Sequence, residues 1–367
     1  MRDVSEQLRD LRILMFPRTM AMGGTEKVVL QLCRALRGKV AYLAVVSCGG
    51  ELVSELDALG VPHFGIPDIT GKNPATFVKI VGKLRRIIRE NGINFIHCHH
   101  RMAALFAQLA APEATHVVAT AHNVFKDRCR GTRISYSNMH VAACGRKVYE
   151  NLVDYFRLSD ELVTLIPNSV PCFDGNTMPI SGIDSCPKDM LKVGFIGRLT
   201  EAKGVAFLID AMALLVERGV PVRCFIAGEG DLEEELRKRT RLSAAARDIV
   251  FLGRLDNPQN YLAQVDVCAI PSLWEGLPLV LLEAFSVGTP VVASATDGLT
   301  DVIRDGENGF LVPPGNALAL ANGIERLDAN IELRGTIAKA ARADYESEYS
   351  YEIWVKRYID FYREALR

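Results

Sequence analysis

The chain has 367 residues, of which 49% are apolar and 24% are charged, with a formal net charge of −1. This length is enough for two domains with a sizeable core, and the near-zero charge excludes a generally basic nucleic-acid binder. Residues 1–180 carry 22 Lys and Arg against 16 Asp and Glu, whereas the remainder carries 21 against 28, so the basic first half favours an acidic partner, either a membrane surface or a phosphate-bearing acceptor.

The N-terminal residues, Met1 to Gln7, are polar and lack the apolar core of a signal peptide. No uncharged apolar run reaches the length of a membrane span. The nine cysteines are odd in number and form no CxxC pair, which favours reduced thiols over a disulfide framework. We therefore expect a cytoplasmic protein, in contact at most with the inner face of the cell membrane.

Short apolar runs alternate with longer helical patterns, which is typical of βα units and a parallel sheet in an α/β fold. Pro171 to Pro187 has little periodicity and predicts a linker, which gives domains at 1–180 and 188–350. The stretch 351–367 predicts a helix whose aromatic residues Trp354, Tyr358, Phe361 and Tyr362 must dock on another surface. The expected strands are 12–16, 40–46, 93–97, 116–120, 139–143, 163–166, 191–196, 222–227, 249–252, 266–270, 290–293 and 310–312.

Two basic segments lie in the first half. Residues 79–90 alternate basic and apolar side chains at helical spacing, which fits a helix that touches anionic lipid or an ordinary sheet-covering helix with a solvated face; the second interpretation is favoured. Lys126, Arg128, Arg130 and Arg133 form a second basic patch. It predicts either a site for an acidic or lipid-diphosphate acceptor or a solvated loop.

Four consecutive residues, His97, Cys98, His99 and His100, could suggest a metal site. Successive residues of a strand point to opposite faces, so the four side chains do not converge easily, and no distant motif completes a zinc site. Packing and site-lining roles are favoured over a metal, and His99 is the best candidate to face a ligand.

A candidate phosphate site follows the expected strand 191–196. Arg198 stands at the carboxyl end of that strand, where open α/β sheets place ligands, and Lys203 precedes the next helix pattern. A guanidinium, an ammonium and a nearby helix N-terminus all suit a diphosphate. The alternative is a pair of solvated surface cations.

A second pair of charged residues, Glu275 and Glu283, stands eight positions apart after the expected strand 266–270. Glu283 lies in an apolar helix pattern that begins near Leu279, and a buried carboxylate needs donors, which sugar hydroxyls supply. The alternatives are a core carboxylate bonded to the protein and, for Glu275, a turn residue. Gly228, Gly253 and Arg254 end two further strands and give weak indications of contact with a nucleotide.

Together these residues resemble glycosyltransferase family four. The resemblance spans nearly the whole chain, with the motifs in the family's order. It is carried by Gly197-Arg198-Leu199 with Lys203-Gly204, Pro271-Ser272 with Glu275-Gly276, Glu283-Ala284, Gly23-Gly24-Thr25-Glu26, His97-Cys98-His99, Thr120-Ala121-His122-Asn123 and Ile166-Pro167-Asn168.

The resemblance implies a GT-B fold, with two Rossmann-like domains facing each other across a cleft and the C-terminal helix packed on the first. Arg198 and Lys203 would bind the donor diphosphate, and Glu283 the ribose. Glu275, with the amides of Gly276 and Leu277, would hold the donor sugar, Gly24 would let its loop approach the phosphate, and His122 would contact the transferred sugar.

The expected activity is transfer of a hexosyl or N-acetylhexosaminyl group, with retention, from a nucleotide diphosphate-sugar to a saccharide or lipid-linked acceptor. A UDP-sugar is the expected donor, although family members with these motifs use UDP, GDP and ADP donors. The resemblance implies no divalent metal and no cofactor. The family and the basic first half together favour a place in cell-envelope or exopolysaccharide assembly. Two alternatives stay open: a UDP-sugar epimerase of GT-B architecture and a non-catalytic donor-binding scaffold subunit.

Overall fold

The computed structural model describes residues 8–71, 73–125 and 129–367. The polar residues 1–7, and Lys126 and Arg128 of the second basic patch, lie outside the described residues. The chain divides into two compact units, Met1–Asn168 with Glu352–Arg367, and Ser169–Tyr351. None of the helices in the described residues is both long and apolar enough to cross a membrane.

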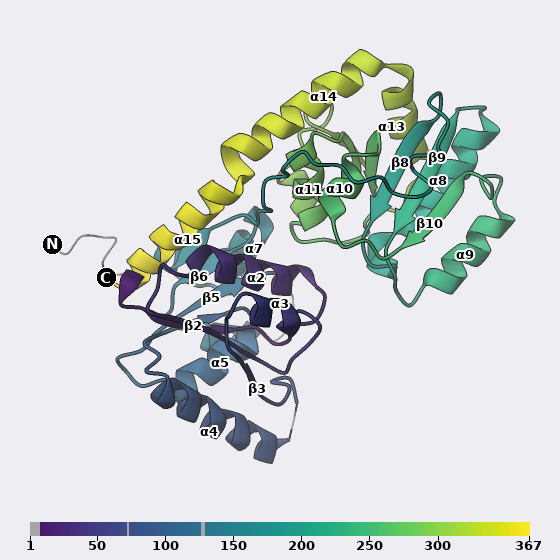
Figure 1. Cartoon of the computed structure of the whole chain (residues 1–367). Coiled ribbons are helices and arrows are strands. Elements are labelled where there is room, and N and C mark those ends of the chain that lie inside the picture. The colour runs from purple at the N-terminus through teal and green to yellow at the C-terminus, as the bar shows by residue number, and fades with distance from the viewer. Residues whose placement is uncertain (1–7, 72, 126–128) are drawn as a thin grey trace. The chain divides into compact units, whose positions relative to one another are not determined.

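The first unit is built on a seven-stranded parallel sheet in the order β3-β2-β1-β4-β5-β6-β7 (Figure 1). Its strands are β1 Arg12–Phe16, β2 Tyr42–Ser47, β3 His63–Gly65, β4 Phe95–Cys98, β5 His116–Ala121, β6 Val141–Ala143 and β7 Val163–Leu165. Its helices are α2 Gly24–Leu36, α3 Val53–Ala58, α4 Pro74–Glu90, α5 Arg101–Ala110, α6 Cys129–Ser135, α7 Arg146–Glu150 continued as a π-helix over Asn151–Tyr155, a 3₁₀ turn Asp160–Leu162, and α15 Tyr351–Ala365.

The second unit is built on a six-stranded parallel sheet in the order β10-β9-β8-β11-β12-β13. Its strands are β8 Leu191–Ile196, β9 Val222–Ala227, β10 Ile249–Gly253, β11 Val267–Ile270, β12 Val291–Ser294 and β13 Phe310–Val312. Its helices are a 3₁₀ turn Glu201–Lys203, α8 Val205–Glu217, α9 Glu233–Leu242, α10 Pro258–Leu262, α11 Leu279–Val287, α12 Asp297–Thr300, α13 Ala317–Ala329, α14 Ile331–Asp344 and a π-helix Tyr345–Tyr349.

Each sheet reverses its strand order once, between β1 and β4 in the first and between β8 and β11 in the second. In open α/β sheets, ligands bind beyond the carboxyl ends of the strands at such a reversal. The fold therefore directs attention to the segments that follow these four strands.

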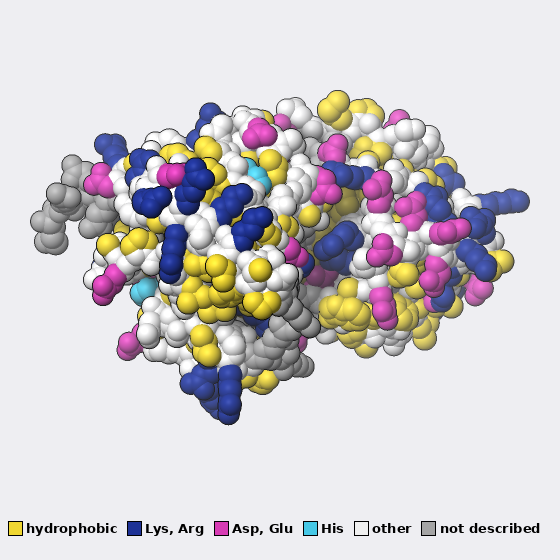
Figure 2. Space-filling view, turned by 90° about the horizontal axis from the view of Figure 1, so that it is seen from below, with side chains coloured by type: hydrophobic (Ala, Val, Ile, Leu, Met, Phe, Trp, Pro, Cys, Tyr) yellow, Lys and Arg dark blue, Asp and Glu magenta, His cyan; other side chains and the backbone are white. Residues whose placement is uncertain are grey.

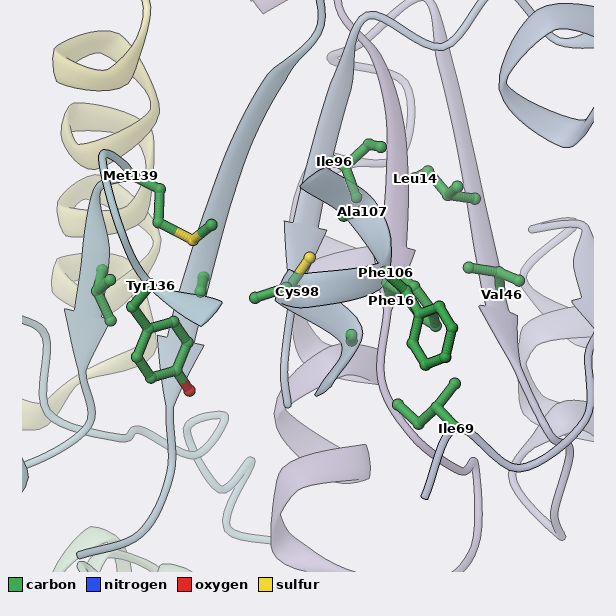
Figure 3. Packing of buried hydrophobic residues seen from close by; sticks show 14 of the residues in the cluster. Leu14, Phe16, Val46, Ile69, Ile96, Cys98, Phe106, Ala107, Tyr136 and Met139 are labelled. Carbon is green, nitrogen blue, oxygen red and sulfur yellow. The ribbon is translucent and has the colours of Figure 1, made fainter. Parts of the chain in front are cut away.

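Alternation along the central strands sends successive side chains of the first sheet to opposite faces. Leu14 and Phe16 of β1 and Ile96 and Cys98 of β4 belong to one buried core, which Figure 3 shows together with Phe106 of α5. The intervening residues of β4 face the other way. Among these, His97 lies within hydrogen-bonding distance of Tyr362 of α15.

The residues that connect the two units differ from the expected linker. The first boundary falls between Asn168 and Ser169, and the segment Pro171–Pro187 is packed as part of the second unit. Ile183 and Cys186 are buried in its core, and the side chain of Asn260 accepts from Met178 N and donates to Met178 O. Side-chain amides thus supply the hydrogen bonds that the irregular backbone of this segment needs. The hydrophobic periodicity of the sequence alone does not predict such bonds.

Candidate functional site

The cations expected to hold a diphosphate lie beyond β8. Arg198 is exposed, and its side chain forms no hydrogen bond or ion pair among the described residues. Lys203 is held: its Nζ forms an ion pair with Glu275 Oε1, which also accepts from Ser272 Oγ at 3.0 Å. Ser272 and Glu275 follow β11, which pairs with β8. The reversal of strand order therefore brings Ser272 and Glu275 into contact with Lys203, whereas the Arg198 guanidinium has no ion-pair partner among the described residues.

Backbones of the strand ends approach closely around this place. Gly228 N donates to Gly253 O at 2.7 Å, and a Cβ on Gly228 would lie 1.9 Å from Gly197 O. Gly228 has a φ of +135°, and a side chain is excluded there both by conformation and by space. Gly253 at the end of β10 has open space beside it, which leaves room for a ligand.

The helix that carries Glu283 begins at Leu279, where its apolar pattern starts. Pro278 is extended, with φ −74° and ψ 135°, and serves as the N-cap of α11, whose first residue is Leu279. Proline has no backbone N–H, and at the start of a helix this donor has no partner within the helix. Leu277 is buried, while Gly276 and Leu279 are half-buried, so this loop and helix start present backbone groups next to Glu275.

Glu283 lies inside the second unit and is 9% exposed. Its carboxylate lies near Cys268 of β11, and burial followed by this negative charge raises the pKa of the Cys268 thiol. Arg254, by contrast, is exposed and lies 3.6 Å from Asp256. Arg254 thus has an acidic neighbour, whereas Arg198 forms no ion pair in the part of the chain that the structure describes.

A pocket of about 210 Å³ lies in the first unit beyond β1, β4 and β5. Its lining residues are Arg18, Thr19, Thr25, Glu26, His99, His100, Arg101, Thr120, His122, Asn123, Phe125 and Tyr136. The segment 23–26, called the glycine loop below, lines the pocket with Thr25 and Glu26. Glu26 Oε1 accepts a hydrogen bond from Thr19 Oγ1. Gly24, the first residue of α2, is exposed with no atom within 4 Å of a Cβ position.

Two guanidinium groups border the pocket. Arg18 forms a bidentate pair with Asp68, at 3.0 and 2.7 Å, and this pair lowers the pKa of the Asp68 carboxyl. Arg101 lies over the ring of Phe125 at 4.4 Å. Arg18, Arg101 and Glu26 were not predicted as site residues from the sequence. They are identified by the structure, because they lie beyond β1 and β4, where the strand order reverses.

Three histidines, His99, His100 and His122, line this pocket, and the buried ring of His97 packs against that of His99. His99 Nδ1 and His122 Nε2 are 3.1 Å apart, and His97 is hydrogen-bonded at both ring nitrogens. Burial lowers the pKa of His97 to about 3 and those of His100 and His122 to about 4. These rings are therefore neutral near pH 7, and among the described residues no cluster of three or more His, Cys, Asp or Glu side chains could hold a metal ion.

Comparison with known proteins places this geometry in a family. Residues 191–330 match the sequence model described as "Glycosyl transferases group 1", and residues 22–172 match "Glycosyltransferase Family 4". The phosphatidyl-myo-inositol mannosyltransferase of Mycobacterium tuberculosis (strain H37Rv) is 31% identical over 342 residues, 88% of each chain. The enzyme of the same name from Mycobacterium leprae (strain TN) is 30% identical over 93% of this chain and 92% of its own.

Solved structures agree in fold. A glycosyltransferase from Rickettsia africae ESF-5 superimposes with a TM-score of 0.83 at 20% identity, covering 97% of this chain and 99% of that one. Anabaena Alr3699/HepE, solved in complex with UDP and glucose, gives a TM-score of 0.81 at 21% identity, covering 96% and 99%. The two parallel sheets have the GT-B architecture, and the chain belongs to glycosyltransferase family four.

Proposed function

We propose that this glycosyltransferase moves a hexosyl or N-acetylhexosaminyl group, with retention of anomeric configuration, from a nucleotide diphosphate-sugar to a saccharide or lipid-linked acceptor. The observation that carries the proposal is the Lys203–Glu275 ion pair at the strand reversal of the second sheet. A Cβ on Gly197, the residue before Arg198, would lie 3.9 Å from Lys203 Cε, and the Arg198 side chain forms no ion pair among the described residues. A positive site with one unneutralised cation suits a diphosphate. The neighbouring carboxylate suits the hydroxyls of the attached sugar.

In the proposed reaction, the bond between the anomeric carbon and the leaving phosphate oxygen breaks, and negative charge grows on the nucleoside diphosphate. Arg198 and Lys203 stabilise that charge as it forms. The acceptor hydroxyl attacks the same face of the sugar, and its proton passes to the departing phosphate oxygen. Bonds and protons balance without a cofactor, since the residues of the chain only bind, orient and neutralise.

A UDP-sugar is the proposed donor, and a lipid-linked or saccharide acceptor of the cell envelope is the proposed recipient. HepE, which shares the fold, was solved with UDP and glucose, and the mannosyltransferase relatives act on phosphatidyl-myo-inositol according to their names. Buried Glu283 at the reversal of the second sheet supplies a carboxylate for ribose hydroxyls. These points support the donor class and leave the base to be determined by binding.

The test is a thermal-shift panel of UDP-, GDP- and ADP-sugars, followed by measurement of nucleoside diphosphate release from those that bind. Arg198→Ala should lower turnover about 10- to 100-fold, because a hydrogen bond to a charged group is worth about 1.5–3 kcal/mol. Arg239→Ala, which removes a cation paired with Asp210 on the surface, is the matched control. Unchanged kinetics in Arg198→Ala would remove Arg198 from the site.

Contact with an anionic membrane is proposed for α4, where a lipid-linked acceptor would approach. Its basic residues Lys79, Lys83, Arg85, Arg86 and Arg89 are all exposed, and Val78 beside them is 70% exposed. Figure 2 shows a face of the molecule on which basic and hydrophobic side chains gather. Each basic residue near such a surface adds about 1 kcal/mol of attraction.

Sedimentation with vesicles tests this contact. The chain should sediment with phosphatidylserine vesicles at low salt and not with phosphatidylcholine vesicles, and Lys83→Glu combined with Arg89→Glu should abolish sedimentation. If wild type and the double variant sediment alike, the basic residues of α4 form a solvated helix face and no more.

A further inference from the structure

The pocket of the first unit is lined by two arginines and a histidine that carry hydrogen-bond donors. Arg18 follows β1, whereas His100 and Arg101 follow β4, and all three line the pocket. The Arg101 guanidinium lies over the ring of Phe125, and its Nη1 donates to Thr132 Oγ1 at 3.3 Å. Two positive charges from separate strand ends therefore meet at this pocket.

Asp68 holds the Arg18 guanidinium by one edge. Arg18 Nε donates to Asp68 Oδ1 at 3.0 Å, and Nη2 donates to Asp68 Oδ2 at 2.7 Å. This side-on pair uses neither hydrogen of Nη1, which forms no hydrogen bond within the described part of the chain. Arg18 lines the pocket and Asp68 does not. The carboxylate thus orients the guanidinium and leaves Nη1 available to a ligand.

His100 offers a second donor because its other ring nitrogen caps a helix. It is the N-cap of α5, and its Nδ1 accepts from Met102 N at 3.1 Å. A neutral imidazole that accepts at Nδ1 carries its hydrogen on Nε2. This Nε2 is accessible to solvent and has no hydrogen-bond partner in the residues that the structure describes. A bound acceptor atom is the partner that it lacks.

The charged groups around His100 produce a positive field. Burial lowers the pKa of His100 to about 4, and the positive charges of Arg101 and Arg18 contribute to this decrease more than Asp68 opposes it. The ring is therefore neutral near pH 7, which keeps the hydrogen on Nε2. An anion beside His100 would be stabilised by the charge of both guanidinium groups.

Glu26, in the glycine loop, is the acidic side chain of the pocket lining, and the start of α2 stabilises its charge. Gly23 is the N-cap of that helix, and a Cβ there would collide with Glu26 Oε2. The carboxylate thus lies over the helix N-terminus, where the helix dipole favours a negative charge. Its Oε1 accepts from Thr19 Oγ1. Glu26 is therefore held within its own loop, which leaves the donors of Arg18 and His100 to an incoming anion.

We propose that Arg18, His100 and Arg101 form a phosphate-binding site, and that the acceptor of this enzyme carries a phosphate ester. Arg18 Nη1 and His100 Nε2 donate hydrogen bonds, and Arg101 supplies charge. Donors from two separate loops suit the oxygens of a phosphate, which point in different directions, better than the two coplanar oxygens of a carboxylate. That the phosphate belongs to the acceptor rests on the proposed glycosyl transfer, whereas the site itself rests on the geometry.

Calorimetric titration of the whole chain near pH 7.5 tests the site without turnover. Glucose 1-phosphate, a free sugar phosphate, or dihexanoylphosphatidic acid below its micellar concentration, a lipid phosphate, should bind at least about 10-fold more tightly than glucose or dihexanoylglycerol. The ester that binds more tightly identifies the source of the phosphate. Equal affinity for esters and neutral counterparts, or for glucuronate and the better ester, would overturn the assignment to phosphate.

Two variants test the donors separately. Arg18→Gln should weaken binding of the better ester about 10-fold or more, the loss of a hydrogen bond to a charged group. His100→Asn keeps an N-cap acceptor for Met102 N but removes Nε2, and it should weaken binding about 10-fold with the melting temperature unchanged. Arg34→Gln, which removes an equally exposed arginine paired with Glu55 in the same unit, is the matched control. Unchanged affinity in Arg18→Gln or His100→Asn would overturn the site.

UDP binding separates this site from the donor site. Arg18→Gln should leave the affinity for UDP unchanged, whereas Arg198→Ala should lower it. A parallel loss of UDP affinity in Arg18→Gln would show that the pocket binds the donor diphosphate, and would overturn the proposal. A chain that binds phosphate esters here but releases no nucleoside diphosphate from any nucleotide-sugar would refute glycosyl transfer and leave the phosphate site standing.

Discussion

At the scale of single residues, the second-unit site depends on how each charge is partnered. Glu275 already accepts from Lys203 and Ser272, so a sugar hydroxyl would compete with or join an existing network. The side chain of Arg198 has no such hydrogen bond or ion pair among the described residues. If the two cations bind the donor diphosphate as proposed, Arg198 is free to move toward the phosphate, whereas Lys203 is already oriented by Glu275.

The substitution Glu283→Gln separates a ligand role from a structural one. It should weaken UDP binding about 10-fold or more, because an amide replaces a charge-assisted acceptor, while the melting temperature changes little. Calorimetric titration and thermal unfolding measure the two effects. Glu325→Gln, which breaks a surface pair with Arg218, is the control, and a collapse of melting temperature with UDP affinity intact would make Glu283 structural.

The buried neutral histidines should make the free energy of unfolding depend on pH in the acid range. Burial lowers the pKa of His97 from an ordinary value of 6.5 to about 3, so below pH 6.5 the unfolded chain takes up a proton that the folded chain refuses. Stability should therefore fall as pH decreases, by about 2 kcal/mol at pH 5 from this residue. Urea unfolding near pH 7.5 and pH 5 measures the loss.

The variant His97→Gln should reduce that pH dependence by about the same 2 kcal/mol, whatever its effect near neutral pH. The same substitution at exposed His116 provides the control. An unaltered pH dependence in His97→Gln would show that this ring is not the group responsible.

At the scale of elements, the loop after β1 is held by the loop after β2. Met20 N donates to Gly49 O at 2.8 Å, and Leu52 N donates to Met20 O at 2.8 Å. Gly50 has a φ of +146°, and a Cβ there would lie 2.3 Å from the backbone of Met20 and Ala21. The loop after β2 thus fixes the backbone position of Met20, in the segment that leads into α2 and the pocket.

Gly50→Ala should displace that loop and reduce turnover at least 10-fold, with a loss of stability of about 1–3 kcal/mol from backbone strain. Gly82→Ala is the contrasting case, because Gly82 is an exposed residue of α4 with nothing within 4 Å of its Cβ position. It should gain about 0.5–1 kcal/mol of stability and keep full turnover. Equal behaviour of the two variants would contradict the tight packing at Gly50.

Much of this element structure follows from the sequence for a physical reason. Central parallel strands are buried on both faces and read as apolar runs, so the expected strands at 191–196 and 310–312 coincide with β8 and β13. Strand β3 was missed because His63–Gly65 is three residues long with little burial. The packing of 171–187 depends on side-chain amides 82 to 88 residues away in the sequence, which no local pattern encodes.

At the scale of the whole molecule, the two units have separate hydrophobic cores. The sequence predicted that Arg198 and Lys203 follow one strand, and both lie beyond the end of β8. It did not predict that His97 meets Tyr362, because this contact joins positions 265 apart. Long-range pairs of this kind come from topology rather than from motif spacing.

Separate cores predict unequal responses to a nucleotide. UDP bound in the second unit should raise the thermal transition of that unit, by about 2.7 kcal/mol of stability at 100 times the dissociation constant, and should not raise the transition of the first unit directly. Scanning calorimetry with and without UDP measures both. Arg198→Ala should suppress the shift, and an equal shift of every transition would show that the units unfold as one.

The contribution of α15 to the first unit also bears on biosynthesis. Because Tyr358 and Tyr362 complete the hydrogen bonds of Thr120 and His97, the pocket region cannot reach its final state while the last helix is still inside the ribosomal exit tunnel. The N-terminal half must wait as a nascent intermediate through synthesis of the entire second unit. The hydrogen bonds behind the first-unit pocket therefore form only after the ribosome has made the whole of Ser169–Tyr351.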